Sequence, residues 1–484
     1  YIIPYNTILD QNAKDIREAL DNYPSILEHH ANVAIETESE QAAYKRLTER
    51  WDSDIILTSL VQFLNACYAA PNSAARRFHR LTNAVLIFDE IQALPKTCKI
   101  LFERAIQFLS SYTHSTILLC TATQPRLSLA SAPVELVPQV EALHEKLKRV
   151  CFIPQLDSAR TYASAGERIA QLLEEKSVLA IINTKAAAWQ VYQEAVQTLR
   201  RRGHAFVRFE KNLPLSDLRE AARACPEDEI LCVYMSTWLC PAHRIKLIAW
   251  IQAWLKAGRR VLCVSTALIE AGINVSFPVV IRDLAGLPSL VQAAGRANRN
   301  MEYGEGKVFI WDFSEETEAL SHLPDVQNGA NLTRGALLKP HSELDAPATL
   351  GQYFESELPY IAEKQKFPVD ASDVSGQKQL IYLSALFASN KACAQAARFH
   401  RASELLVLRQ SFRTASRHFF VIADDATPVI VPWGAGAEII AALKEPHDMR
   451  EEIQLLRRAQ AYTVNVYENV FRRLSDKGAI MPVG

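Results

Sequence analysis

The stretch Ala84–Gln92 reads AVLIFDEIQ and decides the fold of this 484-residue chain. Its first five residues are apolar, and two adjacent carboxylates, Asp89 and Glu90, follow them directly. An apolar run that stops at acidic residues is typical of a buried parallel strand whose end carries carboxylates. The stretch therefore predicts an α/β fold with functional side chains at the carboxyl edge of a sheet.

Two further segments extend this pattern along the chain. The apolar run Thr116–Cys120 stops at Thr121, Ala122 and Thr123, and the string QAAGRANR occupies Gln292–Arg299 far downstream. In this order, the three segments match the Walker B, coupling and arginine-finger motifs of a superfamily 2 helicase. Each motif is modest alone, but the ordered trio indicates an ATP-driven motor.

The acidic and hydroxyl segments predict the chemistry of ATP hydrolysis. We expect Asp89 to hold Mg²⁺ through water and Glu90 to orient and deprotonate the attacking water. The hydroxyls of Thr121 and Thr123 can exchange hydrogen bonds with the acidic segment and sense the phosphate state. The alternatives are an acidic turn before a helix and an ordinary threonine N-cap.

The downstream string predicts arginine fingers. We expect Gln292, Arg296 and Arg299 to share one helix, so that both guanidiniums project from one side and reach phosphates. Gly295 leaves room for a close approach. The alternative is a solvated basic face. The expected ATP contacts are Asp89, Gly272, Asn274, Gln292, Arg296 and Arg299.

Hydroxyl side chains at strand ends predict a track for nucleic-acid phosphates that ignores base sequence. After the strand Val261–Val264, Thr266 is the candidate and Gly272 lets the backbone approach the nucleotide. Each of these residues can equally be a local helix cap. The other candidate DNA-binding residues are Thr7, Thr58, Ser59, Thr184, Ser236 and Thr237.

Strand-like runs alternate with helical patterns over the first two-thirds of the chain, as in doubly wound parallel sheets. The strand-like runs include Val85–Phe88, Ile230–Met235 and Val279–Ile281, and a helical pattern covers Leu290–Asn298. Helix ends are expected at Gly203 and Gly258. We therefore expect two tandem RecA-like domains, a connector and a small C-terminal α+β domain. The expected boundaries are 1–155, 156–315, 316–399 and 400–484. Within the last domain we expect a strand at Phe419–Ile422. The pair His447-Asp448 is expected to lie on the surface, because no matching ligands for a metal accompany it.

Composition limits the partners and the compartment. The formal net charge is -1, so any nucleic-acid contact must be local. Nine scattered cysteines without a Cys-x-x-Cys pair argue for a reducing, cytoplasmic environment and against a structural zinc. No apolar stretch approaches the ~20 residues that span a bilayer. We therefore expect no membrane partner.

A phosphate-binding loop is missing from these residues. Such a loop needs a glycine-rich turn that ends in Gly-Lys-Ser/Thr upstream of the Walker B strand. The first glycine of the chain is Gly166, and no Gly-Lys-Ser/Thr occurs later. We expect a fragment whose first RecA-like domain is N-terminally truncated and whose upstream piece carried the loop.

With these motifs assembled, the chain resembles the CRISPR-associated helicase–nucleases of type I systems, which the Cascade surveillance complex recruits to degrade invading DNA. Two strings are specific to that family: FDEIQALP (Phe88–Pro95) and STWLCPAHR (Ser236–Arg244). Subtype I-C is indicated by the closing segment, with TPVIVP (Thr427–Pro432) and YTVNVY (Tyr462–Tyr467). The remaining strings that carry the resemblance are YIIPYNTILDQN (Tyr1–Asn12), TSLVQFLN (Thr58–Asn65), TATQP (Thr121–Pro125), NTK (Asn183–Lys185), LIEAGINV (Leu268–Val275) and Gln292–Arg299.

The resemblance implies ATP and Mg²⁺ as cofactors, and it implies single-stranded DNA and Cascade as partners. It also implies a histidine–aspartate nuclease domain, which these residues lack together with the phosphate-binding loop. Asn274 stands where many relatives have Asp, which weakens any charged contact there. Two other interpretations stay open: a binding module that hydrolyses nothing, and another superfamily 2 helicase that unwinds RNA.

Overall fold

The computed structural model divides the chain into two compact units. One comprises Tyr1–Pro138 with Phe354–Ala423, and the other comprises Gln139–Tyr353 with Asp424–Gly484. This division differs from the expected boundaries, because residues 139–155 join the second unit and the connector is shared. The structure describes residues 1–4, 6–21, 23–30, 38–121, 123, 126–156, 160–208, 225–226, 228–313, 318–337, 343–365, 368–370, 380–384, 412–421 and 426–482.

The first unit is built on a five-stranded sheet in the order β2-β3-β1-β4-β5, and all of its pairings are parallel. The deciding stretch forms β4, which has the expected bounds and lies between β1 and β5. The strands are β1 (Ile2–Ile3), β2 (Ile26–His29), β3 (Ile55–Ser59), β4 (Val85–Phe88) and β5 (Thr116–Leu119). The main helices are α1 (Asn6–Ala19), α2 (Glu38–Arg50), α3 (Leu60–Tyr68) and α5 (Lys99–Tyr112).

Aromatic packing fixes β4 against two helices of this unit. Phe88 meets Phe63 of α3 and Phe102 of α5 edge to face, with ring centroids 4.8 and 5.0 Å apart. All three side chains are buried in one hydrophobic cluster. Because Phe88 is the last residue of the strand, its burial fixes the point at which the acidic segment leaves the sheet.

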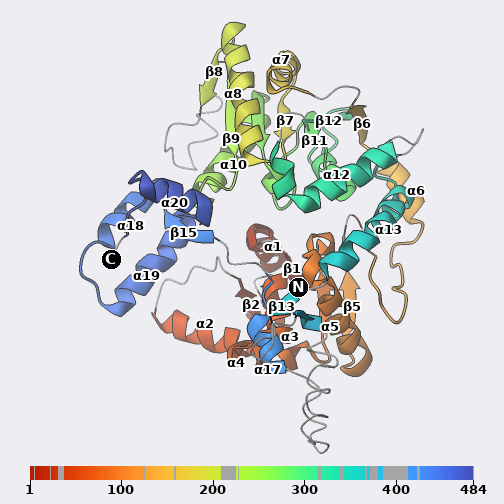
Figure 1. The fold of residues 1–484 in the computed structure, drawn as a ribbon, viewed down its shortest axis with the longest axis vertical. Coiled ribbons are helices and arrows are strands. Elements are labelled where there is room, and N and C mark those ends of the chain that lie inside the picture. The colour runs from red at the N-terminus through yellow and green to blue at the C-terminus, as the bar shows by residue number, and fades with distance from the viewer. Residues whose placement is uncertain are drawn as a thin grey trace, which may run out of the picture. The chain divides into compact units, whose positions relative to one another are not determined.

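The second unit contains a seven-stranded parallel sheet in the order β6-β12-β11-β7-β10-β9-β8 (Figure 1). β6, which lies inside the expected first domain, pairs with β12 and therefore belongs to this sheet. The strands are β6 (Val150–Gln155), β7 (Val178–Ile181), β8 (Phe206–Arg208), β9 (Ile230–Met235), β10 (Arg260–Ser265), β11 (Val279–Asp283) and β12 (Gly306–Trp311). The helices are α6 (Val140–Lys146), α7 (Tyr162–Leu173), α8 (Lys185–Arg201), α10 (Pro241–Lys256), α11 (Leu287–Ala294) and α12 (Pro324–Leu337). The division between the two units falls within α13 (Pro347–Lys364), after Tyr353.

Alternate residues of the central strands face two separate cores. In β7, Leu179 and Ile181 join the cluster that includes α10 and α11, while Val178 and Ala180 join the cluster that includes α7 and α8. Both faces of the sheet are therefore covered by helices, which is why its strands read as continuous apolar runs. The expected α/β class with two parallel sheets is confirmed.

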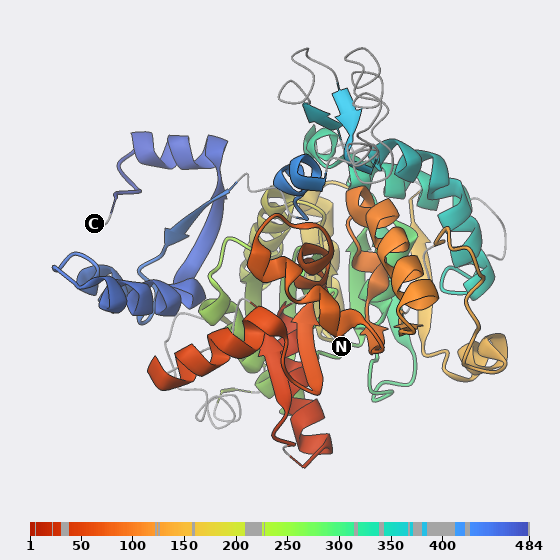
Figure 2. The same cartoon turned by 90° about the horizontal axis from the view of Figure 1, so that it is seen from below.

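The end of the chain forms a small α+β segment. Strands β15 (Ala426–Ile430) and β16 (Thr463–Tyr467) pair antiparallel, with Ala426 opposite Tyr467. Figure 2 shows this ribbon with helices of the same segment around it. They are α18 (Gly436–Ala442), α19 (Met449–Ala459) and α20 (Glu468–Asp476).

Two expected elements differ in the structure. The strand expected at Phe419–Ile422 is wrong over its described residues, because Phe419–Val421 follow helix α17 (Phe412–His418) without pairing; Ile422 lies outside the described residues. The helix expected to extend to Asn298 is shorter in the structure, because α11 ends at Ala294. By contrast, Gly203 and Gly258 adopt positive φ angles of 75° and 70° just after α8 and α10, as expected for helix ends.

We predict that Gly329→Ala destabilises the second unit. A Cβ at this position of α12 would lie 2.8 Å from the Cα of Gly286, which caps α11. Backbone atoms cannot yield as a flexible side chain does, so we expect a loss of about 1–3 kcal/mol in chemical unfolding. Gly335→Ala on the same helix is the matched control, because its Cβ would meet nothing within 4 Å. A Gly329→Ala protein as stable as the control would contradict this packing.

Candidate nucleotide and nucleic-acid site

The acidic segment leaves the sheet through an unusual backbone turn. Asp89 still donates its N–H to the carbonyl oxygen of Ile2 over 2.9 Å, so it continues the parallel ladder. Glu90 then adopts φ 52° and ψ 41°, in the left-handed region that side chains rarely enter. This turn lets the two adjacent carboxylates leave the strand without pointing to opposite faces, as a continued strand would require.

Both carboxylate oxygens of Asp89 accept hydrogen bonds. The backbone N–H of Glu90 donates to Oδ1 over 2.9 Å, and the hydroxyl of Tyr1 donates to Oδ2. Burial, followed by the hydrogen bond to Asp89, raises the pKa of the Tyr1 hydroxyl, so it remains a neutral donor. Asn12 in turn donates to the Tyr1 oxygen over 2.8 Å. Asp89 is therefore held in one orientation at the sheet edge.

Gln92 links the acidic segment to the hydroxyl segment. Its side-chain nitrogen donates to Glu90, and its side-chain oxygen accepts from the hydroxyl of Thr121. The N–H of Thr123 donates to that same hydroxyl over 3.1 Å. Ala122 lies outside the described residues. We call Glu90, Gln92 and Thr121 the polar relay.

The motif pattern alone assigns no role to Gln92, although the residue stands in the deciding stretch. Helical spacing gives no signal for this contact, because side chains align three positions apart in a tight turn such as η2 (Ile91–Ala93), and Gln92 is two positions after Glu90. Thr123 adds a second polar feature, because its hydroxyl is buried without a partner among the described residues. A buried unpaired hydroxyl is costly and is typical of a site that accommodates another group.

The expected shared helix of the arginine segment is wrong. Gly295 caps α11, and the chain then turns through Asn298, whose φ is 45°. Arg296 folds inward, where Nε donates to the carbonyl of Ile269 over 3.1 Å and Nη2 to that of Glu270 over 2.5 Å. Arg299 is exposed, so the two arginines do not project from one helical side.

A buried polar network lies beneath this segment. Arg282 is 2% exposed, and its Nε lies 2.7 Å from Oε1 of Glu270. Ser289 donates to the other oxygen of Glu270 over 2.7 Å, and Arg282 donates to Asn183 over 2.6 Å. Burial raises the pKa of Glu270, although Arg282 opposes that shift. Burial likewise raises the pKa of Asp283 to about 6.

The remaining expected nucleotide contacts lie near this network. Gly272 has a φ of 75°, so only glycine fits its turn without strain. Asn274 is exposed, and its backbone oxygen accepts from Gln252 over 2.7 Å. Gln292 is half-buried on α11.

In the first unit, the candidate hydroxyls have local partners. Thr58 is 2% exposed and donates to the carbonyl of His29 over 2.9 Å. Ser59 accepts from the N–H of Gln62 as the N-cap of α3. Thr7 lies in α1, and its side chain lies outside the described residues. These hydrogen bonds favour the interpretation of Thr58 and Ser59 as local structural groups.

In the second unit, the candidate hydroxyls gather at one edge of the sheet. Thr184 follows β7 and caps α8 by accepting from Ala187. Ser236 is buried after β9 and accepts from the N–H of Trp238 over 3.2 Å, while Thr237 is exposed. Thr266 is half-buried after β10. Because β10 pairs with both β7 and β9, these three strand ends are neighbours.

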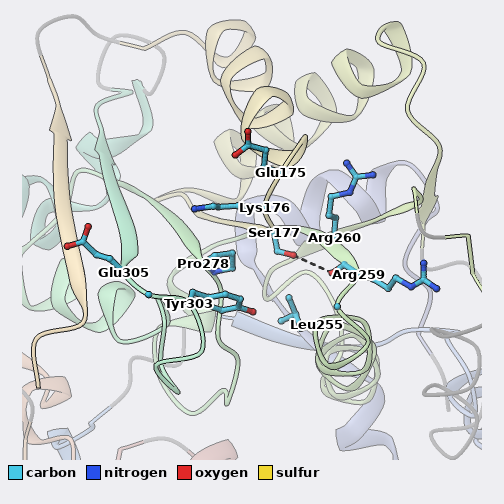
Figure 3. Close-up of a pocket in the computed structure, with 11 residues that line it drawn as sticks. Glu175, Lys176, Ser177, Leu255, Arg259, Arg260, Pro278, Tyr303 and Glu305 are labelled. Carbon is cyan, nitrogen blue, oxygen red and sulfur yellow. Dashed lines mark hydrogen bonds between the residues drawn. The ribbon is translucent and has the colours of Figure 1, made fainter.

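A cavity of about 510 Å³ opens at the opposite edge of the same sheet (Figure 3). Ser177 precedes β7, Arg260 begins β10 and Pro278 precedes β11, so the lining residues lie at the amino ends of the strands. The hydroxyl of Ser177 donates to the carbonyl of Arg259 over 3.4 Å inside it. Ligands of parallel α/β sheets bind at the carboxyl edge, so this cavity is separate from the motifs.

Two groups of side chains that could ligate a metal make contacts within the protein instead. Asp448 is exposed and caps α19 by accepting from the N–H groups of Arg450 and Glu451, each over 2.8 Å, while His447 is half-buried. Among the described residues, one further group has potential ligand atoms within 4.8 Å of one another: His144, Glu145 and Glu343. Lys148 already pairs with Glu343, and the two glutamates are exposed.

Part of this chain matches a known protein family. The family described as CRISPR-associated nuclease/helicase Cas3, C-terminal, matches residues 174–302. The CRISPR-associated nuclease/helicase Cas3 of Haloferax volcanii is 25% identical over 448 residues, covering 74% of this chain and 48% of that protein. Over these residues the chain is similar to Cas3 nuclease/helicases.

Solved Cas3 structures share the fold. The crystal structure of T. fusca Cas3 with AMPPNP has a TM-score of 0.59 at 15% identity, and the one with ADP has 0.60 at 14%. Each match covers 96% of this chain and 58% of the other. The chain thus spans about half the length of the curated Cas3 relative. No helix among the described residues is long and apolar enough to cross a membrane.

We predict that Arg296→Ala destabilises the protein while Arg299→Ala does not. Arg296 is 7% exposed and satisfies two backbone carbonyls, so its loss leaves buried acceptors unpaired. We expect a loss of about 2–3 kcal/mol on urea unfolding, since hydrogen bonds to charged groups are strong. The exposed Arg299 should change stability by less than about 0.5 kcal/mol. Equal stability of the two variants would show that Arg296 has no structural role.

Proposed function

We propose that this chain is the helicase portion of an ATP-dependent translocase on single-stranded DNA that unwinds invader DNA for degradation in type I CRISPR interference. The observation that carries the proposal is the polar relay. It joins the carboxylate suited to activate water with the hydroxyl segment suited to sense phosphate. A change at Glu90 therefore reaches Thr121 through one side chain.

The residues fit one side of an ATP–Mg²⁺ site. Each carboxylate oxygen of Asp89 accepts one hydrogen bond and keeps a further lone pair. This arrangement suits a cation that is bound through water. Bound Mg²⁺ supplies charge neutralisation on the phosphates. The glycine-rich phosphate loop is absent from the 484 residues. Glu90 takes the proton of the attacking water, and Gln92 holds that carboxylate in place.

The exposed Arg299 is the better candidate for an arginine finger. Arg299 is exposed beyond the end of α11, whereas the Arg296 guanidinium is committed to Ile269 and Glu270. A guanidinium that meets developing charge lowers the barrier to phosphoryl transfer. Arg296 positions the segment that carries Gly272, Asn274 and the strand end at Thr266.

Single-stranded DNA and Cascade are the proposed partners. The hydroxyls of Thr184, Thr237 and Thr266 lie at one sheet edge and suit phosphates without reading bases. The docking of Cascade and the cooperation with a histidine–aspartate nuclease domain rest on the resemblance to Cas3. The scattered cysteines, which are typical of proteins in a reducing compartment, support a cytoplasmic location. All eight described cysteines are free thiols.

The second candidate is a module that binds single-stranded DNA without hydrolysing ATP. The missing Gly-Lys-Ser/Thr favours it for these residues taken alone. We expect the purified 484-residue chain to show no DNA-stimulated ATP turnover, because no backbone cradle holds the phosphates. A coupled-enzyme assay measures this directly, and robust turnover would contradict the prediction.

We predict that Glu90→Gln strongly slows ATP hydrolysis in a protein that joins these residues to a phosphate-binding loop. The variant should bind nucleotide like the parent but lose about 10²–10⁴ in kcat, because the general base is gone. Gln92→Leu should lower kcat as well, since it cuts the relay without removing the base. Arg299→Ala should lower kcat by about 10³. An unchanged kcat in Glu90→Gln would remove Glu90 from this role.

A further inference from the structure

An exposed aromatic and cationic cluster stands at the carboxyl edge of the second sheet. Trp238 follows β9 and is 49% exposed, and Tyr467 ends β16 and is 57% exposed. The Nζ atom of Lys185 lies 5.8 Å from the ring centroid of Trp238 and 5.6 Å from that of Tyr467. Three segments far apart in the sequence therefore place two rings around one ammonium group.

The charge of Lys185 is not neutralised by a carboxylate among the described residues. Its ammonium group faces the two rings, and its backbone carbonyl accepts a hydrogen bond from Tyr234. Lys185 is half-buried, and this burial lowers the pKa of its ammonium group. The acidic neighbour Glu468 pairs with Arg472 over 2.6 Å. The cluster thus offers positive charge beside two aromatic faces.

Other large aromatic side chains of this unit are used for packing. Trp250 and Trp254 are 4% and 0% exposed in the core. Trp189 is 38% exposed, but its ring stacks on that of Tyr192 with centroids 5.5 Å apart. Trp238 differs, because it keeps about half of its surface in solvent at the edge where Thr184 and Thr266 also lie. An exposed indole at a functional edge is typical of a contact surface.

We propose that Trp238 and Tyr467 form a base-stacking platform for single-stranded DNA, with Lys185 as its phosphate contact. The proposal rests on the proposed single-strand function and adds the residues that hold the bases. Unpaired bases present free π faces, whereas the bases of a duplex are already stacked on one another. The strand-end hydroxyls hold the backbone, and the rings give affinity without base preference.

Binding measurements with oligothymidylate and with an abasic strand of equal length test the platform. Fluorescence anisotropy compares the DNA affinity of the full 484-residue chain with that of Trp238→Ala, Tyr467→Ala and the double variant. Each single change should weaken oligothymidylate binding by about tenfold with an unchanged salt slope. The double variant should bind both strands equally, because the abasic strand has phosphates but nothing to stack.

Three controls separate stacking from charge and from misfolding. Trp238→Phe should retain most of the affinity, because phenylalanine still stacks. Lys185→Gln should reduce the salt slope by about 0.7, as expected for one lost phosphate contact on a single strand. Tyr112→Ala removes a ring that is 76% exposed at the end of α5 and should leave binding unchanged. Thermal unfolding should match the parent for every variant.

The outcomes separate this proposal from the one on which it rests. If the parent chain does not bind oligothymidylate, the single-strand function and the platform are both overturned. If the parent binds and the double variant binds equally well, only the platform is overturned. A parent that binds duplex DNA as tightly as the single strand also overturns the platform, because a duplex exposes no stackable face along its length.

Discussion

Parallel pairing around β10 is the constraint on which the candidate DNA surface depends. Ser265 at the end of β10 is in register with Ile181 of β7 and with Met235 of β9. This register places Thr184, Trp238 and Thr266 just beyond neighbouring strand ends, although they come from three distant parts of the sequence. A shift of one residue would move every core side chain to the other face, so burial on both faces holds this register.

Two arginines then hold the segment that follows β10. Arg282 reaches Glu270 from β11, and Arg296 reaches the carbonyls of Ile269 and Glu270 from beyond α11. A buried ion pair loses hydration and is stabilised only when further hydrogen bonds complete it. Ser289 and Asn183 supply those bonds here. The network therefore holds Ile269 and Glu270 in place shortly before Gly272 and Asn274.

The sequence predicted much of this arrangement, because apolar runs in a sheet covered on both faces are easy to recognise. Val85–Phe88 and Ile230–Met235 form strands with the expected bounds. β11 continues past the expected end at Ile281 because partners elsewhere in the chain compensate the buried Arg282 and Asp283. The shared helix failed for a related reason: Arg296 finds carbonyl acceptors 26 and 27 residues away, and spacing along a helix carries no information about them.

The acidic segment shows how one local contact sets a functional geometry. A left-handed glutamate costs of order 1 kcal/mol and persists only where its surroundings determine it. Here the N–H of Glu90 is held by Asp89, its carbonyl accepts from the N–H of Ala93 over 3.0 Å, and its carboxylate accepts from Gln92. Backbone and side chain are thus both fixed by residues of the same short stretch. The orientation of Glu90 is therefore set within the unit itself, where Thr121 contacts the Gln92 amide and Tyr1 contacts the Asp89 carboxylate.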